Sequence, residues 1–153
     1  SLTGHEGAIR DFRWSNIDPT STNPNSQGVG FIVTLSVDQS IKVFDIARNK
    51  AECLMTLRHE NHIGSLALSP DNSLLAVGGQ NSDIYIWSLK DKSSSAASSI
   101  ILQNNDNDID PNSKAIFDIN WSFDGTVVAA GFEKSVVMLD LKKILSTPVE
   151  NLI

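Results

Sequence analysis

Three side chains near the start of the sequence are of the types that perform nucleophilic catalysis together. Ser36 stands two residues before Asp38 in the stretch LSVDQSIKVFD, and His5 precedes both in LTGHEG. A hydroxyl activated by a histidine, which a carboxylate orients in turn, is the arrangement of a hydrolytic triad. Whether these residues catalyse a reaction or hold a fold together depends on the elements that position them.

The segments around these residues recur along the chain. The stretches AIRDFRWS (8–15), HIGSLALS (62–69) and AIFDINWS (115–122) each alternate large apolar residues with smaller or polar ones, and each ends in serine. A turn follows each stretch, then a short apolar run, a second polar turn and another strand-like run. The short apolar runs are 31–36, 74–79 and 127–131. The strand-like runs that follow them are 41–46, 84–89 and 136–141. One further strand each, at 52–57 and 98–103, follows the first and second units.

Four short strands per repeat, at a period of roughly 40–50 residues, are typical of β-propeller blades. We therefore predict an all-β fold, a partial propeller of about three four-stranded antiparallel blades whose last blade lacks its outer strand. The expected blade units are 5–57, 59–103 and 114–143, followed by a C-terminal tail at 144–153. Because uncapped blades leave exposed strand edges and apolar faces, we expect 1–153 to be the C-terminal part of a longer propeller.

These repeats resemble the WD-repeat family, in which a histidine, a Ser or Thr, a turn aspartate and an aromatic residue form a hydrogen-bonded tetrad. His5, Ser36 (or Thr34 on the same face), Asp38 and Phe44 occupy those places in the first unit. Phe44 replaces the usual tryptophan and so lacks an indole N–H. Such a network pairs buried polar groups and ties a loop to a strand.

The tetrad changes in the later units, which favours a structural role. The second unit has His59, Asn81 and Trp87 at the matching places, with Gly79 where Ser36 stood. The third unit has neither the histidine nor the tryptophan. A nucleophile would also need a substrate cleft and oxyanion donors. We therefore predict no enzyme activity and no catalytic residue, and keep a propeller hydrolase as the least favoured alternative.

Two segments resemble one branch of the WD-repeat family more closely. FRWSNIDPTSTNPNSQ is similar to the long first-turn insertion of the transducin-beta-like corepressor subunits, and AIFDINWSFDGTVVAAGFEKSVVMLDLKK is similar to their last repeat. The resemblance implies a non-catalytic scaffold of a nuclear histone deacetylase corepressor complex, acting in transcriptional repression. Its partners would be corepressor and deacetylase subunits, together with further blades from the same protein or a second chain. The alternative is the substrate receptor of a ubiquitin ligase.

Partner binding is expected on the face that carries the β-turns between the second and third strands and the loops between units, because loops on rigid scaffolds commonly carry function. Phe132 is of particular interest, since an aromatic residue in an exposed turn can anchor a peptide, although it could equally pack against the neighbouring blade. The nominated residues are Glu6, Arg10, Asp38, Glu60, His62, Gln80, Phe132 and Glu133.

Composition argues against several other classes of function. The net charge is −6 with 12 basic residues spread thinly, so direct nucleic-acid binding is not expected. Cys53 is the sole cysteine, and no apolar run approaches the ~18 residues of a membrane-spanning helix. The aspartates of DNDID (106–110) and the pair His59 and His62 do not complete a calcium or zinc site. We expect no metal and no cofactor. Trp14 and Trp121 are expected to pack between blades.

Overall fold

The computed structural model describes residues 2–15, 30–47, 50–59, 62–80, 82–89, 99–102 and 115–142. These ranges contain eleven β-strands, and none of their helical residues form a segment long and apolar enough to cross a membrane. The strands are β1 (Ile9–Trp14), β2 (Phe31–Ser36), β3 (Ser40–Ala47), β4 (Lys50–Arg58), β5 (Ile63–Leu68), β6 (Leu74–Gly79), β7 (Ile84–Ser88), β8 (Ser99–Leu102), β9 (Asp118–Trp121), β10 (Val127–Gly131) and β11 (Val136–Asp140).

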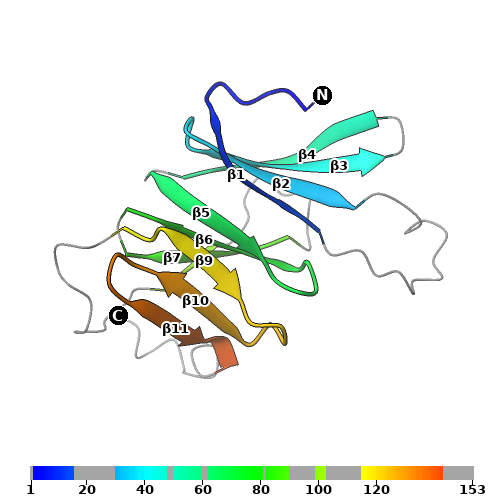
Figure 1. The fold of residues 1–153 in the computed structure, drawn as a ribbon. Coiled ribbons are helices and arrows are strands. Elements are labelled where there is room, and N and C mark those ends of the chain that lie inside the picture. Colours follow the sequence, from blue (N-terminus) through cyan, green and yellow to red (C-terminus); the bar gives the residue numbers. More distant parts are fainter. Residues whose placement is uncertain are drawn as a thin grey trace.

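The strands form three antiparallel sheets in sequence order: β1-β2-β3-β4, β5-β6-β7-β8 and the three-stranded β9-β10-β11 (Figure 1). Each sheet is a meander, since every strand pairs with the next one along the chain. The predicted fold class is confirmed: the chain is all-β, with three blade-like sheets, the last of them three-stranded in the described residues.

Two apolar cores hold the sheets together, one at each junction. The first includes Leu35 and Val43 of the first sheet with Leu66 and Val77 of the second, all fully buried. The second joins the second and third sheets through residues such as Ala76, Ile84, Ile119 and Val128. The strands β2 and β6 are almost wholly buried, and each lies inside its sheet with a strand paired on either side.

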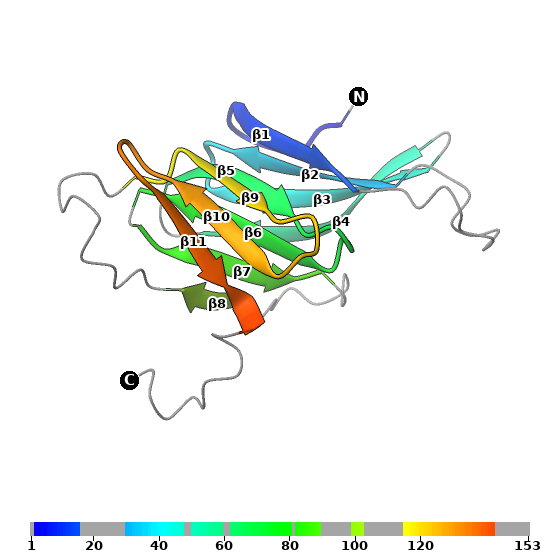
Figure 2. The ribbon, with the colours of Figure 1, turned by 60° about the horizontal axis from the view of Figure 1, so that its bottom comes forward.

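The first strands of the three units lie side by side, with β5 between β1 and β9 (Figures 1 and 2). A hydrogen-bond chain runs across them at one repeat position. The Ser65 hydroxyl lies 3.4 Å from Asp11 Oδ2 and 3.2 Å from Asp118 Oδ1, and the Leu66 N–H donates to Asp11. These polar contacts fix the order in which the strands follow one another around the stack.

The turns after β5 and β9 are stabilised by the serines seen in the repeat. The hydroxyls of Ser69 and Ser122 donate to Asp71 and Asp124, and each serine oxygen accepts the N–H of the first residue of the following strand. The hydrogen bond from Ser69, followed by those from Ser73, lowers the pKa of Asp71 to about 2. Asp124 is held in the same way, first by Ser122, and its pKa is also about 2. The repeated serines are therefore turn-forming residues.

Trp14 and Trp121 occupy the same repeat position but have different surroundings. The Trp121 indole N–H donates to the Ala67 carbonyl of the preceding sheet at 3.0 Å. Trp14 is 54% exposed, because no described sheet lies in front of β1. The packing expected between blades therefore holds for Trp121, whereas Trp14 is uncovered. The outer faces of the first and third sheets also expose Phe12 and Met138.

Candidate protein-interaction face

The residues of the first-unit tetrad meet at one end of the first sheet. His5 precedes β1, Thr34 is in β2, and Asp38 and Ser40 flank the β2–β3 turn. His5 Nδ1 lies 2.8 Å from Ser40 Oγ and 3.3 Å from Asp38 Oδ2, and His5 Nε2 lies 2.7 Å from Thr34 Oγ1. The histidine therefore joins the loop before β1 to the second strand and to the turn after it.

The hydroxyl that reaches the histidine is that of Thr34, the alternative considered beside Ser36. Ser36 Oγ instead accepts the N–H of Asp38 at 3.2 Å and so closes the turn. Both side chains lie on one face of β2, but Ser36 is the last residue of the strand and is nearer to the turn backbone. Ser40, which sequence reasoning did not single out, is the additional member of the network.

The Ser40 hydroxyl determines which atoms of this network donate and which accept. The Ser40 hydroxyl donates to Asp38 Oδ1, so its single proton is not available to His5. Nδ1 of His5 is therefore the donor toward Ser40 and Asp38, and Nε2 pairs with the Thr34 hydroxyl, which also lies 3.4 Å from the Lys42 carbonyl. Burial by itself raises the pKa of Asp38, but the hydrogen bonds from Ser40 and from the Glu6 N–H, with His5 nearby, hold it well below its usual value.

The order carboxylate, imidazole, hydroxyl is that of a triad, but the setting does not suit acyl transfer. Thr34 is 6% exposed and lies in the middle of β2, which pairs with β1 on one side and β3 on the other. The N–H groups of a strand paired on both edges are used in the sheet, so none is free to stabilise an oxyanion near Thr34. The network ties elements together.

Aromatic packing completes both tetrads. Phe44 is buried and stands edge-on to His5, with ring centroids 6.4 Å apart. In the second unit His59 stands edge-on to Trp87 at 5.9 Å and to Tyr85 at 4.1 Å. Tyr85 was not anticipated from the sequence, and Asn81 lies outside the described residues. Edge-to-face contact thus takes the place of an indole hydrogen bond at Phe44.

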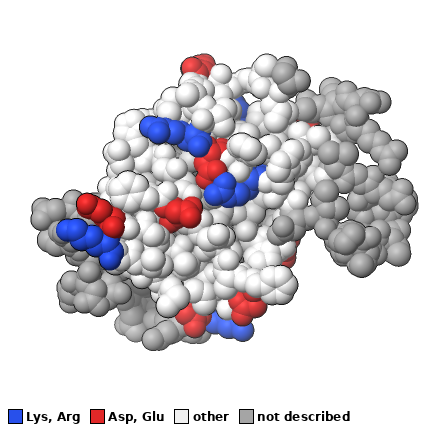
Figure 3. All heavy atoms as spheres, in the orientation of Figure 1, with Lys and Arg blue, Asp and Glu red and all other residues white. Residues whose placement is uncertain are grey.

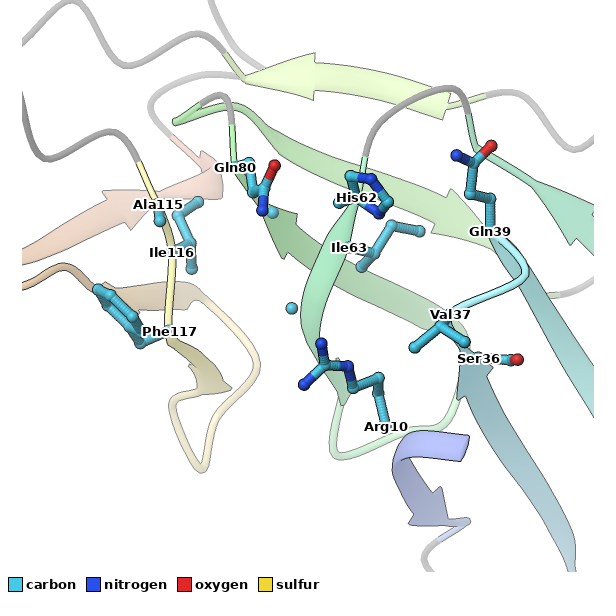
Figure 4. Close-up of a pocket in the computed structure, with 12 residues that line it drawn as sticks. Arg10, Ser36, Val37, Gln39, His62, Ile63, Gln80, Ala115, Ile116 and Phe117 are labelled. Atoms are coloured by element: carbon cyan, nitrogen blue, oxygen red, sulfur yellow. The ribbon is translucent and has the colours of Figure 1, made fainter. Parts of the chain in front are cut away.

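A cavity of about 460 Å³ opens beside this network, where all three sheets meet (Figure 4). It lies at the starts of β5 and β9, beside Arg10 near the start of β1, and at the ends of β2 and β6. Its lining combines basic and amide side chains with apolar ones. The lining residues are Arg10, Ser36, Val37, Gln39, His62, Ile63, Gly64, Gly79, Gln80, Ala115, Ile116 and Phe117.

Three β-bulges at one repeat position shape this cavity. The register between β1 and β2 shifts at Arg10, and that between β5 and β6 shifts at Gly64. In the third unit Phe117 and Asp118 both face Gly131, since the Phe117 N–H donates to the Gly131 carbonyl and Asp118 pairs with the same residue. A bulge bends its strand and re-aims a side chain, so Arg10 leaves the sheet pattern at the cavity rim, whereas the Phe117 ring points away from the cavity (Figure 4).

Several of the nominated partner-binding residues surround this face. Arg10, His62 and Gln80 line the cavity and are exposed, while the Glu6 N–H bonds to Asp38 on the adjoining turn at 2.7 Å. Glu133 is exposed in the β10–β11 turn and does not line the cavity. Glu60 lies outside the described residues.

Phe132, the residue of particular interest, takes the second of the two places considered for it. Its ring is 8% exposed and belongs to the core between the second and third sheets, with Ile116 and Val137. The neighbouring aromatic residue Phe117 is 66% exposed, its ring points away from the cavity in Figure 4, and sequence reasoning did not nominate it. Its repeat position is that of Arg10, a signal in the sequence from which its exposure could have been inferred.

Comparisons with known proteins agree on the fold. The family model described as "KNTC1, N-terminal" matches residues 15–147. The crystal structure of the C-terminal WD40 domain of Sif2 is similar with a TM-score of 0.66 and 17% sequence identity, over 92% of this chain and 36% of that one. The likeness shows a WD40 fold.

Two sequence relatives have names that refer to ribosomes. A ribosome biogenesis protein WDR12 homolog of Anopheles gambiae is 22% identical over 92% of this chain. The small ribosomal subunit protein RACK1 of Drosophila melanogaster is 33% identical over 58% of it. The chain spans 34% of the length of the first relative and 24% of the second.

Proposed function

Because the chain belongs to the family described as "KNTC1, N-terminal" and has a WD40 fold, we propose that it is a non-catalytic scaffold that binds other proteins. The observation that carries this proposal is the face where the three sheets meet. There a cavity of about 460 Å³ is bordered by exposed side chains on rigid strand ends. Pockets of this size that combine apolar walls with a few polar groups are the usual form of binding sites.

The finer assignment that we put forward is a subunit of a nuclear histone deacetylase corepressor complex. It is supported by the resemblance of the insertion after Trp14 and of the last repeat to the transducin-beta-like corepressor subunits. A role in ribosome assembly or on the ribosome is the second candidate, since one relative is named as a ribosome biogenesis protein and another as a protein of the small ribosomal subunit.

We further propose that additional blades cover the outer faces of the first and third sheets. Trp121 supports this, because its indole N–H bonds to the sheet in front of its own. Trp14 holds the same place with nothing described in front of it. A shallow apolar hollow of about 220 Å³ on that outer face, lined by residues such as Phe12, Ile32 and Phe44, would receive the side chains of a preceding blade.

Affinity purification of the tagged full-length protein tests the scaffold and its assignment together. Val37→Ser alters the cavity face, and Val136→Ser is the matched control, because Val136 is 68% exposed at the start of β11 and does not line the cavity. We expect the unmodified protein and the control to retain deacetylase subunits and Val37→Ser to lose them.

Other results would contradict parts of the proposal. Recovery of cullin-type ligase parts or of ribosome assembly factors without deacetylase subunits would overturn the corepressor assignment. Equal recovery with Val37→Ser would place partner binding away from this face.

A further inference from the structure

We propose that Asp118 holds a further β-sheet of the same protein against the outer face of the third sheet, by accepting a backbone N–H from the first strand of that further sheet. This inference rests on the proposal above that additional blades cover the outer faces, and it names the contact that holds one of them. No described sheet lies against this face, which is formed by β9, β10 and β11 (Figure 2).

The place of Asp118 in its sheet is one that all three sheets share. Asp118 holds the same place in the third sheet that Asp11 holds in the first and Ser65 holds in the second. Each follows the bulge in the first strand and lies opposite the fifth residue of the second strand. Charge alone does not mark this place, because acidic and basic side chains are interspersed on the face shown in Figure 3. We therefore infer the role of Asp118 from that of Asp11.

Asp11 shows how a carboxylate at this place joins two sheets. Its Oδ1 accepts the N–H of Phe12 in its own strand at 2.8 Å. Its Oδ2 accepts the Leu66 N–H of the following sheet at 3.2 Å and lies 3.4 Å from the Ser65 hydroxyl. Hydrogen bonds from a backbone N–H to a carboxylate are stronger than those between neutral groups. The Asp11 carboxylate therefore sets the position of the second sheet relative to the first.

Asp118 makes the contact within its own strand and has an oxygen left for a following sheet. Its Oδ1 accepts the Ile119 N–H at 3.0 Å and lies 3.2 Å from the Ser65 hydroxyl of the preceding sheet. Its Oδ2 has no hydrogen-bond partner among the described residues. Asp118 is exposed, whereas the Asp11 side chain, next to the second sheet, is 17% exposed. Oδ2 of Asp118 thus has the place of the Asp11 oxygen that accepts from the next sheet.

An apolar side chain on the same face also repeats a position whose occupant is known. Ile86 of β7 lies opposite Ala76 and is 5% exposed, because it belongs to the core between the second and third sheets. Met138 of β11 lies opposite Ala129, which is the same place in the third sheet, and is 74% exposed. Covering Met138 would remove apolar surface from water. Because the two places are alike, we infer the same kind of occupant, an antiparallel sheet.

Proteins of this fold have enough chain for such a sheet. The chain spans 34% of the length of the first sequence relative and 36% of the similar solved structure. A four-stranded blade needs roughly 40–50 residues. The first strand of the further sheet should carry a serine or threonine just before the donor residue, as Ser65 precedes Leu66.

Methionine oxidation in the full-length protein tests whether a sheet covers this face. Hydrogen peroxide converts accessible methionines to the sulfoxide, and mass spectrometry measures the rate at each one. We expect Met138 to react nearly as slowly as Met55, which is 5% exposed and serves as the buried reference. Reaction of Met138 at the rate seen in the urea-unfolded protein would mean that nothing covers it.

Hydrogen exchange in the same protein tests the contact itself. Asp118→Ala should accelerate the exchange of one backbone amide in the further sheet by about tenfold or more, because it removes a hydrogen bond to a charged group. Asp11→Ala is the reference, and should accelerate exchange at Leu66 to a similar extent. Asn120→Ala is the control, since Asn120 is exposed two residues along β9 and its side chain accepts the Trp121 N–H of its own strand. It should leave the amide in the further sheet unchanged.

The two measurements separate this inference from the proposals on which it rests. Slow oxidation of Met138 with no responding amide in Asp118→Ala would mean that a sheet covers the face but that Asp118 does not hold it, and this inference alone would be wrong. Rapid oxidation of Met138 would overturn the additional blade as well. The binding of other proteins is tested independently by Val37→Ser in the purification above.

Discussion

At the scale of single residues, the side chains that resemble a triad stabilise the first sheet. Thr34, His5, Asp38 and Ser40 form one connected network in which each polar group has a partner. Sequence reasoning identified the histidine, the aspartate and the pair of candidate hydroxyls, because all lie at recognisable repeat positions. It could not choose between Thr34 and Ser36, since both have the same side-chain direction and differ in their distance from the turn.

Thr34→Val should lower the free energy of unfolding of the full-length protein by about 1–3 kcal/mol, because it leaves Nε2 of His5 without its partner. The His5 side chain is 7% exposed, so water does not readily replace the hydroxyl. Chemical denaturation measures the change. Ser36→Ala is the control and should cost less, since it removes a longer hydrogen bond of 3.2 Å. Equal stability of Thr34→Val and the unmodified protein would contradict a structural network.

The turn aspartates predict how stability depends on pH. The pKa of Asp71 is lowered from 3.8 to about 2 by its serine hydrogen bonds. A carboxyl whose folded pKa is depressed stabilises the protein above its unfolded pKa and loses that contribution as pH falls through the folded value. We therefore expect the free energy of unfolding to fall between pH 3.8 and about 2. Asp71→Asn should show a shallower decline in urea titrations over this range, and an identical decline would contradict the prediction.

At the scale of elements, strand positions could be predicted well, whereas the residues of the cavity rim could not. The expected runs 31–36, 74–79 and 127–131 coincide with β2, β6 and β10, because each is a short apolar stretch between turn residues. The bulges at Arg10, Gly64 and Phe117 were not anticipated. A bulge adds one residue to one strand and shifts which side chains face outward, and an alternating pattern in the sequence does not reveal it.

The junction between the second and third sheets depends on a glycine. A Cβ atom on Gly78 would lie 2.5 Å from Cγ2 and 3.0 Å from Cβ of Ile116, which is 2% exposed. Gly78→Ala should therefore destabilise the full-length protein by about 1–3 kcal/mol, since overpacking forces neighbouring side chains to move. Gly131→Ala is the control, with its nearest contact at 3.7 Å. Thermal unfolding compares the two, and equal melting temperatures would contradict the tight junction.

At the scale of the whole molecule, the stack has two covered junctions and two uncovered apolar faces. The number of sheets followed from the repeat, because each unit supplies its own meander. The burial of Phe132 and the exposure of Phe117 did not follow, since both depend on how one sheet meets the next. Those contacts are set by residues that are far apart in the sequence, such as Gly78 and Ile116.

Paired tryptophan variants test whether a further blade precedes the first sheet in the full-length protein. Trp121→Phe should cost about 1 kcal/mol in unfolding free energy, because it removes the hydrogen bond to Ala67. If a blade covers Trp14, then Trp14→Phe should cost a similar amount. A negligible effect of Trp14→Phe beside a measurable effect of Trp121→Phe would mean that Trp14 faces solvent.

The hydrogen bond from Trp121 to Ala67 also joins two sheets that are synthesised one after the other. The acceptor residue Ala67 precedes the donor residue Trp121 by 54 residues, so the carbonyl leaves the ribosome before the indole that donates to it. Domains synthesised from the N-terminus fold as they emerge. Each newly synthesised sheet therefore packs against a sheet that has already been synthesised, and we expect the stack to assemble in the order of translation.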